Sequence, residues 1–159
     1  MGHTNNAMLV YMTPYTVARR FIGLAETPGA MDNPAVLAML RLDDTSVEHD
    51  ETPWCSAFVN WCCWLLEAPR SKSLAARSWL RVGHPIPIAE ARAGHDLVIF
   101  TRAGSTADAS ILKAPGHVGF FVEYLPGSRT VRVLGGNQDN RVSVADFPLA
   151  LVLGVRRLS

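Results

Sequence analysis

Residues 52–66 read TPWCSAFVNWCCWLL and contain all three cysteines of the chain. After Pro53 only Ser56 and Asn60 are polar, and a helix that is apolar on nearly all sides is buried on nearly all sides. Thr52 is a suitable N-cap, and a proline fits the first helical turn. The stretch therefore predicts a buried helix around which the other elements pack.

The three cysteines have different expected roles. On a helix Cys55 and Cys62 lie about 10 Å apart along the axis, which is too far for a shared tetrahedral metal or a disulfide. An odd number of cysteines also favours free thiols. Cys62 and Cys63 lie mid-helix and are predicted to fill the core. Cys55 falls in the first turn, where free N–H groups and the helix dipole lower a thiol pKa, so it is the candidate reactive thiol.

Composition indicates one folded domain. The chain has 159 residues, of which 48% are hydrophobic and 18% charged. A net charge of +1 gives no long-range field to attract nucleic acid or anionic lipid. No apolar run approaches the roughly 18 to 20 residues that span a bilayer, and the start has no basic region typical of a signal peptide. We expect a monomeric single domain over residues 1–159, with 1–12 as a loosely ordered leader, no nucleic-acid partner and no membrane insertion.

The rest of the chain divides into helices followed by strands. Helical spacing predicts a helix from Pro14 with Thr13 as its cap, a short helix opening at Asn33, and a third over residues 73–82. Helices first and strands later indicate an α+β fold with an antiparallel sheet. A polar segment, residues 103–116, is long enough to be a functional wall or a flap. The predicted strands are 96–102, 117–124, 130–137, 141–144 and 150–158.

The second and third predicted strands form a hairpin. The connecting segment LPGSR, residues 125–129, carries a Pro-Gly turn signal. If Tyr124 faces Thr130, the register pairs residues whose numbers sum to 254. The register then determines which side chains from the two strands meet.

This register suggests a partner for Cys55. His117 is the one histidine that opens a predicted strand, and it would face Asn137 at about 4.5 to 5.5 Å between Cβ atoms. An amide oxygen at that distance can accept from an imidazole N–H. Gly119 would face Gly135, and this pair without side chains would let the start of the Cys55 helix approach the sheet closely. A thiol nucleophile needs such a base and a group to orient it; the alternative is a hairpin whose histidine and asparagine merely satisfy one another.

Three motifs in this order, PWCSAFVNW, GHVGFFV and VLGGNQ, resemble the papain-like cell-wall hydrolases of the NlpC-like and CHAP superfamily. The segments GLAETPG, NPAVL, SLAARSWL and LGVRR are similar to a phage-associated branch, so the resemblance runs from about residue 14 to the end. It implies N-terminal helices packed on an antiparallel sheet, with the nucleophile at a buried helix N-terminus. It also implies that a thiolate hydrolyses an amide bond of peptidoglycan. Cys55 matches the nucleophile, His117 the general base and Asn137 the orienting residue.

The chain departs from that superfamily at one position. Many CHAP members have an acidic residue two positions before the asparagine, where this chain has Gly135. The third role is therefore expected of Asn137, with Gln138 or Asp139 as substitutes. Trp54 is an auxiliary candidate for substrate contact, and no cofactor or metal is expected.

The resemblance implies a lysis function whose details stay open. We expect an endopeptidase or N-acetylmuramoyl-L-alanine amidase acting on bacterial peptidoglycan as a phage endolysin without a separate wall-binding domain. It would be made in the host cytoplasm without a signal peptide and reach the wall with the help of a holin or a secretion system. Two alternatives remain: a wall-fragment binding module without turnover, which Gly135 favours, and a secreted antibacterial amidase effector.

Overall fold

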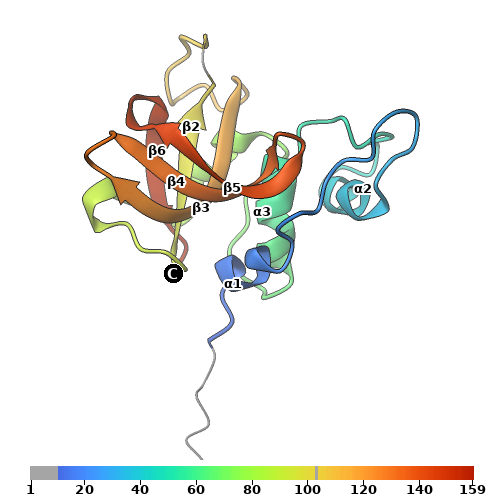
Figure 1. Ribbon diagram of the computed structural model, residues 1–159, viewed down its shortest axis with the longest axis horizontal. Coiled ribbons are helices and arrows are strands. Elements are labelled where there is room, and N and C mark those ends of the chain that lie inside the picture. Colours follow the sequence, from blue (N-terminus) through green and yellow to red (C-terminus); the bar gives the residue numbers. More distant parts are fainter. Residues whose placement is uncertain (1–10, 103) are drawn as a thin grey trace, which may run out of the picture.

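A single antiparallel sheet organises the molecule, as the sequence predicts. The computed structural model describes residues 11–102 and 104–159. Its six strands follow the order β1-β6-β2-β3-β4-β5, and α3 lies against β3 and β4 (Figure 1). The helices are α1 (Pro14–Arg19), α2 (Pro34–Arg41), α3 (Cys55–Trp64) and the short 3₁₀ helices η1 (Ala76–Arg81), η2 (Ile88–Glu90) and η3 (Leu149–Leu151). The strands are β1 (His84–Ile86), β2 (Asp96–Thr101), β3 (Gly116–Leu125), β4 (Thr130–Gln138), β5 (Arg141–Pro148) and β6 (Val152–Arg157).

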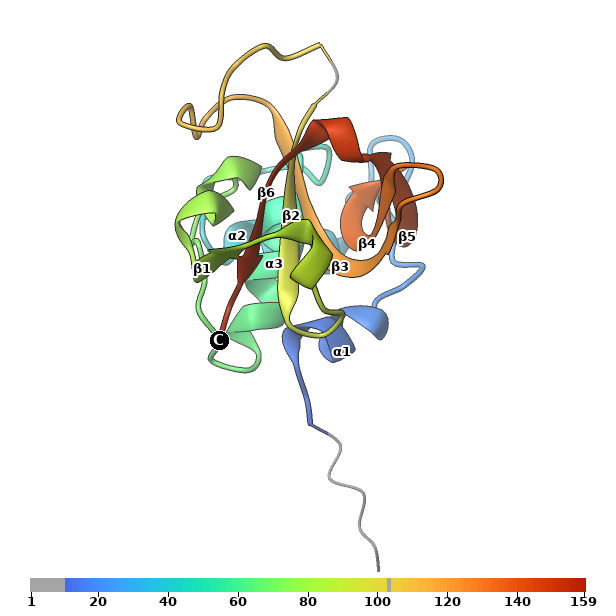
Figure 2. The same cartoon turned by 90° about the vertical axis from the view of Figure 1, so that its left-hand side faces the viewer.

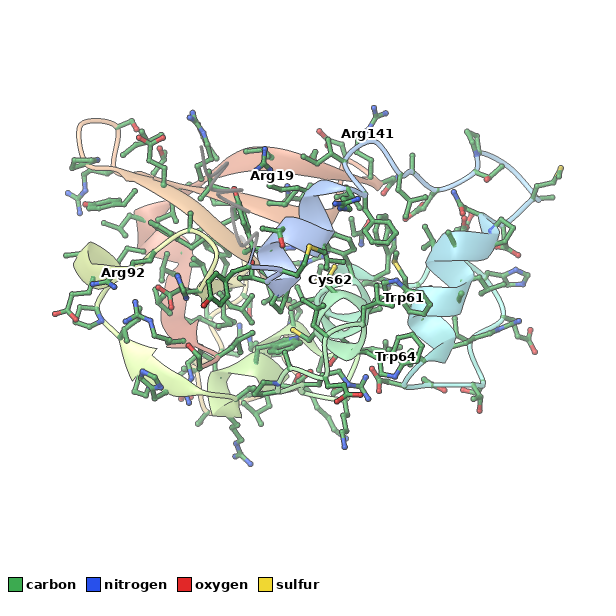
Figure 3. The ribbon with its side chains drawn as sticks, turned by 90° about the horizontal axis from the view of Figure 1, so that it is seen from below. Arg19, Trp61, Cys62, Trp64, Arg92 and Arg141 are labelled. Carbon is green, nitrogen blue, oxygen red and sulfur yellow. The ribbon has the colours of Figure 1, made fainter. Side chains whose placement is uncertain are left out.

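Helix α3 is the buried helix that residues 52–66 predict, but it begins later than expected. Trp54 is its N-cap and makes no side-chain capping bond, so the predicted cap at Thr52 is wrong. Cys55 is therefore the first helical residue. Cys62 and Cys63 are fully buried, which confirms their predicted place in the core. Figure 3 shows Cys62 among packed side chains, with Trp61 and Trp64 on the same helix.

The two polar residues of α3 hold a neighbouring loop. Ser56 Oγ donates to the carbonyl of Ser73 (2.6 Å), and Asn60 Oδ1 accepts from the backbone N–H of Lys72 (3.0 Å). Trp79 of η1 donates its indole N–H to Ser56 Oγ (2.9 Å). These hydrogen bonds offset the cost of burying the two polar side chains. They also attach η1 to the core helix.

The N-terminal helix is shorter than its apolar spacing predicts. Thr13 caps it and Pro14 occupies its first turn, as expected, but α1 ends at Arg19. The chain beyond it lies along β5, where the backbone N–H of Val142 donates to Leu24 O (2.7 Å). That pairing satisfies backbone groups that a longer helix would have used.

Two further predictions need correction. The third predicted helix, residues 73–82, is the shorter 3₁₀ helix η1, and strand β1 was not predicted. Strand β1 is three residues long and includes Pro85, so it shows little of the alternation that marks a strand. It pairs with β6 at the edge of the sheet, where a proline is tolerated.

The hairpin of β3 and β4 has the predicted register over only part of its length. Phe121 pairs with Val133, whose numbers sum to 254 as expected. The register then shifts, so Thr130 faces Leu125 rather than Tyr124. A β-bulge of this kind places two residues of one strand opposite one of the other.

Strand β2, in the middle of the sheet, is buried on both faces. Alternate strand residues point to opposite sides, so Leu97 and Ile99 pack beneath α1–α3, whereas Val98 and Phe100 join a second apolar cluster on the other face. In the part of the chain that the structure describes, no helix is both long and apolar enough to cross a bilayer. The connection between β2 and β3 projects beyond the ends of these strands (Figure 2).

Candidate active site

Cys55 is a buried thiol with a lowered pKa. Burial has the largest single effect and raises the pKa, whereas a hydrogen bond to the His117 side chain and the charge of that ring lower it. The backbone N–H of Val118 and the positive charge of Arg102 add to the lowering. The surroundings therefore favour the thiolate, which is the nucleophilic form of cysteine.

The His117 ring stacks against a pair of aromatic side chains that also contact each other. Its centroid lies 6.2 Å from that of Phe100 and 5.0 Å from that of Phe147, with interplanar angles of 29° and 25°. Its Nε2 atom lies 2.9 Å from Gln138 Oε1. A carbonyl oxygen only accepts, so Nε2 carries a proton, and Nδ1 is the nitrogen left to exchange a proton with Cys55.

Gln138 reaches His117 because β4 changes register near its end. The pairing of β4 with β5 shifts between Gly135 and Gln138, and Asn137 has a positive φ of 56°. Gln138 then pairs with Arg141 across a two-residue turn. Both turn residues, Asp139 and Asn140, also have positive φ, as a type I′ hairpin requires, and Asp and Asn tolerate that conformation.

The Gln138 side chain has one orientation. Its Nε2 donates to Ser143 O (2.7 Å) and Ser143 Oγ (3.2 Å), which leaves Oε1 to face His117. Gly135 provides the space for this contact, because a Cβ there would lie 2.5 Å from Gln138 Oε1 and 3.2 Å from His117 Nε2. Position 135, which is acidic in many CHAP proteins, therefore has no side chain here. Gln138 lies beside the histidine instead.

The structure brings Cys55 and His117 together but does not pair His117 with Asn137. The expectation that these two residues face each other across the hairpin is wrong, because the β4 ladder shifts before Asn137. Within residues 11–102 and 104–159, no hydrogen bond joins His117 to Asn137 or to Asp139. Both lie instead in the wall of a hollow beside the histidine.

Trp54 supports the site from beneath. It is fully buried, so the expectation that it contacts substrate is wrong. Its indole N–H donates to Glu26 Oε1 (2.7 Å). A Cβ on Gly136 would lie 2.7 Å from both the Trp54 ring and Phe58 Cβ. The close approach of α3 to the sheet therefore occurs at Gly136, and not over the predicted pair of Gly119 and Gly135.

Two hollows lie on either side of the Cys55–His117 pair. The hollow beside Cys55 has a volume of about 320 Å³ and the hollow beside His117 about 430 Å³, and Arg102 lines both. The first also contains Lys113 and no acidic residue, whereas the second contains Asp139 and Asp146. The charged side chains beside Cys55 are therefore basic, whereas those beside His117 are of both signs.

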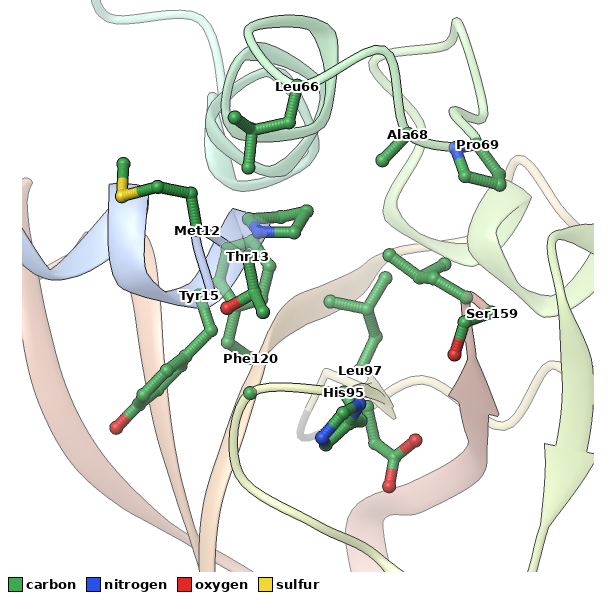
Figure 4. Close-up of a pocket in the computed structure, with 14 residues that line it drawn as sticks. Met12, Thr13, Tyr15, Leu66, Ala68, Pro69, His95, Leu97, Phe120 and Ser159 are labelled. Atoms are coloured by element: carbon green, nitrogen blue, oxygen red, sulfur yellow. The ribbon is translucent and has the colours of Figure 1, made fainter. Parts of the chain in front are cut away.

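A separate cavity of about 220 Å³ lies at the other end of β2 and β3. Figure 4 shows it between the start of α1, the segment after α3 and the turn that carries His95. Neither Cys55 nor His117 lines it. Across the described part of the chain, no group of three or more His, Cys, Asp or Glu side chains is arranged to hold a metal ion.

Sequence reasoning missed two of the residues that complete the histidine's surroundings and gave the third, Gln138, only as a substitute for Asn137. Phe100 and Phe147 come from two other strands, and nothing in their local sequence marks them as neighbours of His117. Gln138 did have a signal, since GGNQDN, residues 135–140, is rich in residues that accept positive φ. That composition indicates an irregular strand end and a tight turn.

The elements described above form an NlpC-like fold, in which a helix starting with a cysteine packs on an antiparallel sheet that carries a histidine. The structure of NlpC1 from Trichomonas vaginalis is similar, with a TM-score of 0.52 and 18% sequence identity. The match covers 91% of this chain and 42% of that one, so the chain spans about two fifths of the length of NlpC1. At this identity the likeness concerns the fold. No protein-family profile and no curated protein matches the sequence.

Proposed function

We propose that the protein is a thiol-dependent peptidoglycan hydrolase that cleaves an amide bond of the cell-wall peptide. The observation that carries the proposal is the Cys55–His117–Gln138 arrangement. It joins a thiol of lowered pKa to an imidazole whose far nitrogen donates to an amide oxygen at 2.9 Å. The NlpC-like fold supports this class of chemistry.

In the proposed reaction the Cys55 thiolate attacks the carbonyl carbon of the scissile amide. The C–N bond breaks as the protonated His117 gives a proton from Nδ1 to the leaving amine, which leaves an acyl thioester on Cys55. His117 then takes a proton from a water molecule, whose oxygen attacks the thioester; the C–S bond breaks and releases the acid product and the Cys55 thiolate, which restores the starting thiolate and protonated His117. Gln138 keeps the ring in one plane and one tautomer throughout both steps.

The start of α3 supports the developing oxyanion. Trp54 makes no side-chain capping bond, so no cap occupies the N–H groups of the first turn. The backbone N–H of Cys55 is the donor closest to an acyl group on its own sulfur. A donor of this kind contributes about 3 kcal/mol to stabilising the transition state.

Digestion of purified peptidoglycan tests the proposal. Mass spectrometry should detect released fragments with the unchanged protein and none with Cys55→Ala, and the fragment masses identify the bond as an amidase or an endopeptidase target. Cys62→Ala is a matched control, because it removes another buried cysteine of the same helix and should retain digestion. Fragments released by folded Cys55→Ala would refute the proposed nucleophile.

The same assay distinguishes hydrolysis from binding without turnover. The place of Gln138 beside His117 supports hydrolysis. Although Gly135 provides no acid, the imidazole still has a hydrogen-bond partner in the Gln138 side chain. We further propose a phage setting, in which the enzyme is made in the host cytoplasm and a holin gives it access to the wall. A neighbouring holin gene would favour this setting, and a neighbouring immunity gene would favour an antibacterial effector.

A further inference from the structure

Arg77, in η1, is a fully buried arginine. Its guanidinium makes six hydrogen bonds, and all six go to uncharged oxygens. Within the described residues it takes part in no ion pair. A buried charge without a counter-ion is costly unless hydrogen bonds satisfy it fully. Six charge-assisted bonds do so only in one geometry, so the side chain and its acceptors fix one another.

Five of the six bonds go to the segment between β2 and β3, and the sixth goes to Thr101, the last residue of β2. Arg77 Nε and Nη2 both donate to Pro115 O, at 3.0 and 2.9 Å, at the far stem of the connection. Nη2 also reaches the near stem, at Thr101 Oγ1 (2.9 Å). The remaining acceptors lie in the middle: Ser105 Oγ (3.3 Å), Ala107 O (3.0 Å) and Asp108 O (2.7 Å). One guanidinium thus crosslinks both stems and the middle of this projecting segment.

The crosslink lies next to the candidate active site. Pro115 is two residues before His117, and a Cβ on the intervening Gly116 would lie 3.0 Å from Arg77 Cγ. Arg102, at the near stem, donates from Nε to Gly116 O (3.1 Å). The position of Arg77 therefore fixes the backbone from which the His117 side chain extends.

The same connection forms the basic wall of the hollow beside Cys55. Arg102 and Lys113 line the hollow beside Cys55, together with Pro115. We propose that Arg77 is a positioning residue that holds this wall, and its two positive charges, beside the Cys55 thiol. The proposal extends the proposed function, because it assigns a role in that site to a residue that touches neither Cys55 nor substrate.

Alkylation of Cys55 tests the positioning role without a wall substrate. Iodoacetate is negatively charged and iodoacetamide is neutral, so the ratio of their rates reports positive charge close to the thiol. Arg77→Lys keeps the charge but cannot make the forked bonds to both stems. We expect the iodoacetate-to-iodoacetamide ratio to fall about fivefold, the factor for loss of one positive charge about 4 Å from the carboxylate of the reagent at the dielectric constant of water. An unchanged ratio in a folded Arg77→Lys protein would overturn the proposal.

Matched variants separate positioning from a loss of fold. Arg70→Lys is the control, because Arg70 is partly buried and pairs with Asp43, and neither residue lines the two hollows. Its ratio should equal that of the unchanged protein. If Arg77→Lys does not fold by circular dichroism, the double variant Thr101→Val with Ser105→Ala removes two acceptors and keeps Arg77, and an unchanged ratio there also overturns the proposal. Failure of the unchanged protein to digest peptidoglycan would refute the proposed function but leave this test of Arg77 intact.

Discussion

Substitution of Gly135 by alanine should displace Gln138 from His117. The added Cβ would lie 2.5 Å from Gln138 Oε1, 3.1 Å from Gln138 Cδ and 3.2 Å from His117 Nε2. The first of these contacts is closer than packed atoms allow, so one group must move. Because Oε1 is at the end of a flexible side chain, Gln138 moves away from His117 while the backbone stays in place.

The cost of that movement falls on the histidine. His117 is 6% exposed, so its Nε2 proton would lose its acceptor with little access to water. An unsatisfied buried donor costs about 1 to 3 kcal/mol, which corresponds to a loss of about 5-fold to 150-fold in rate if the bond is needed in the transition state. The free energy of unfolding should fall by a similar amount, about 1 to 3 kcal/mol, because water satisfies the same donor in the unfolded chain.

The measurement compares Gly135→Ala with Gly127→Ala. Gly127 is the control, because a Cβ added there would have no heavy atom within 4 Å. Alanine at position 127 is thus the same substitution without a steric clash. Initial rates of peptidoglycan digestion and urea unfolding are measured for both variants. A Gly135→Ala protein that digests the wall as fast as Gly127→Ala would refute the role of Gln138 in orienting His117.

Three further predictions concern the surrounding residues. His117→Ala removes the interactions that lower the Cys55 pKa, so the pH at which iodoacetamide reacts at half its maximal rate should rise; an unchanged pH profile would contradict the thiol–imidazole contact. Cys62→Ser places a hydroxyl in a fully buried apolar site and should lower the free energy of unfolding by about 1 to 3 kcal/mol in urea, while Cys55 alkylation stays unchanged. Gly136→Ala forces a Cβ to 2.7 Å from Phe58 and should destabilise by about 1 to 3 kcal/mol, measured by urea unfolding; a neutral effect would mean that α3 can move away from the sheet.

The helices and strands that the sequence predicts well are those with strong local signals. The buried helix, the capped start of α1 at Thr13 and the Val-rich strands needed only hydrophobic pattern and capping chemistry. The end of α1 was not predictable in this way. Its apolar spacing continues to Leu24, and only the distant strand β5 decides that Leu24 accepts from Val142 instead of a helical neighbour.

The candidate site shows why two of its three residues were easier to find than the third. Cys55 and His117 are marked by local position, at a helix start and at a strand start. The third residue depends on register, and a shift of one residue turns every side chain to the opposite face of a strand. Between Gly135 and Gln138 the ladder makes such a shift, so the amide that faces His117 belongs to Gln138 and not to Asn137.

This register shift explains why position 135 is a glycine and not an acid. An acidic side chain there would occupy the space through which Gln138 reaches the imidazole, as the 2.5 Å approach of a Cβ to Oε1 demonstrates. The contact between Gln138 and His117 therefore requires a glycine three residues earlier, at position 135. Gly135→Asp combined with Gln138→Ala should restore a hydrogen-bond acceptor to His117, whereas Gly135→Asp alone should place two side chains in one space. Recovery of the digestion rate in the double variant relative to Gln138→Ala alone is the measurement that tests this coupling, and a double variant no faster than Gln138→Ala would contradict it.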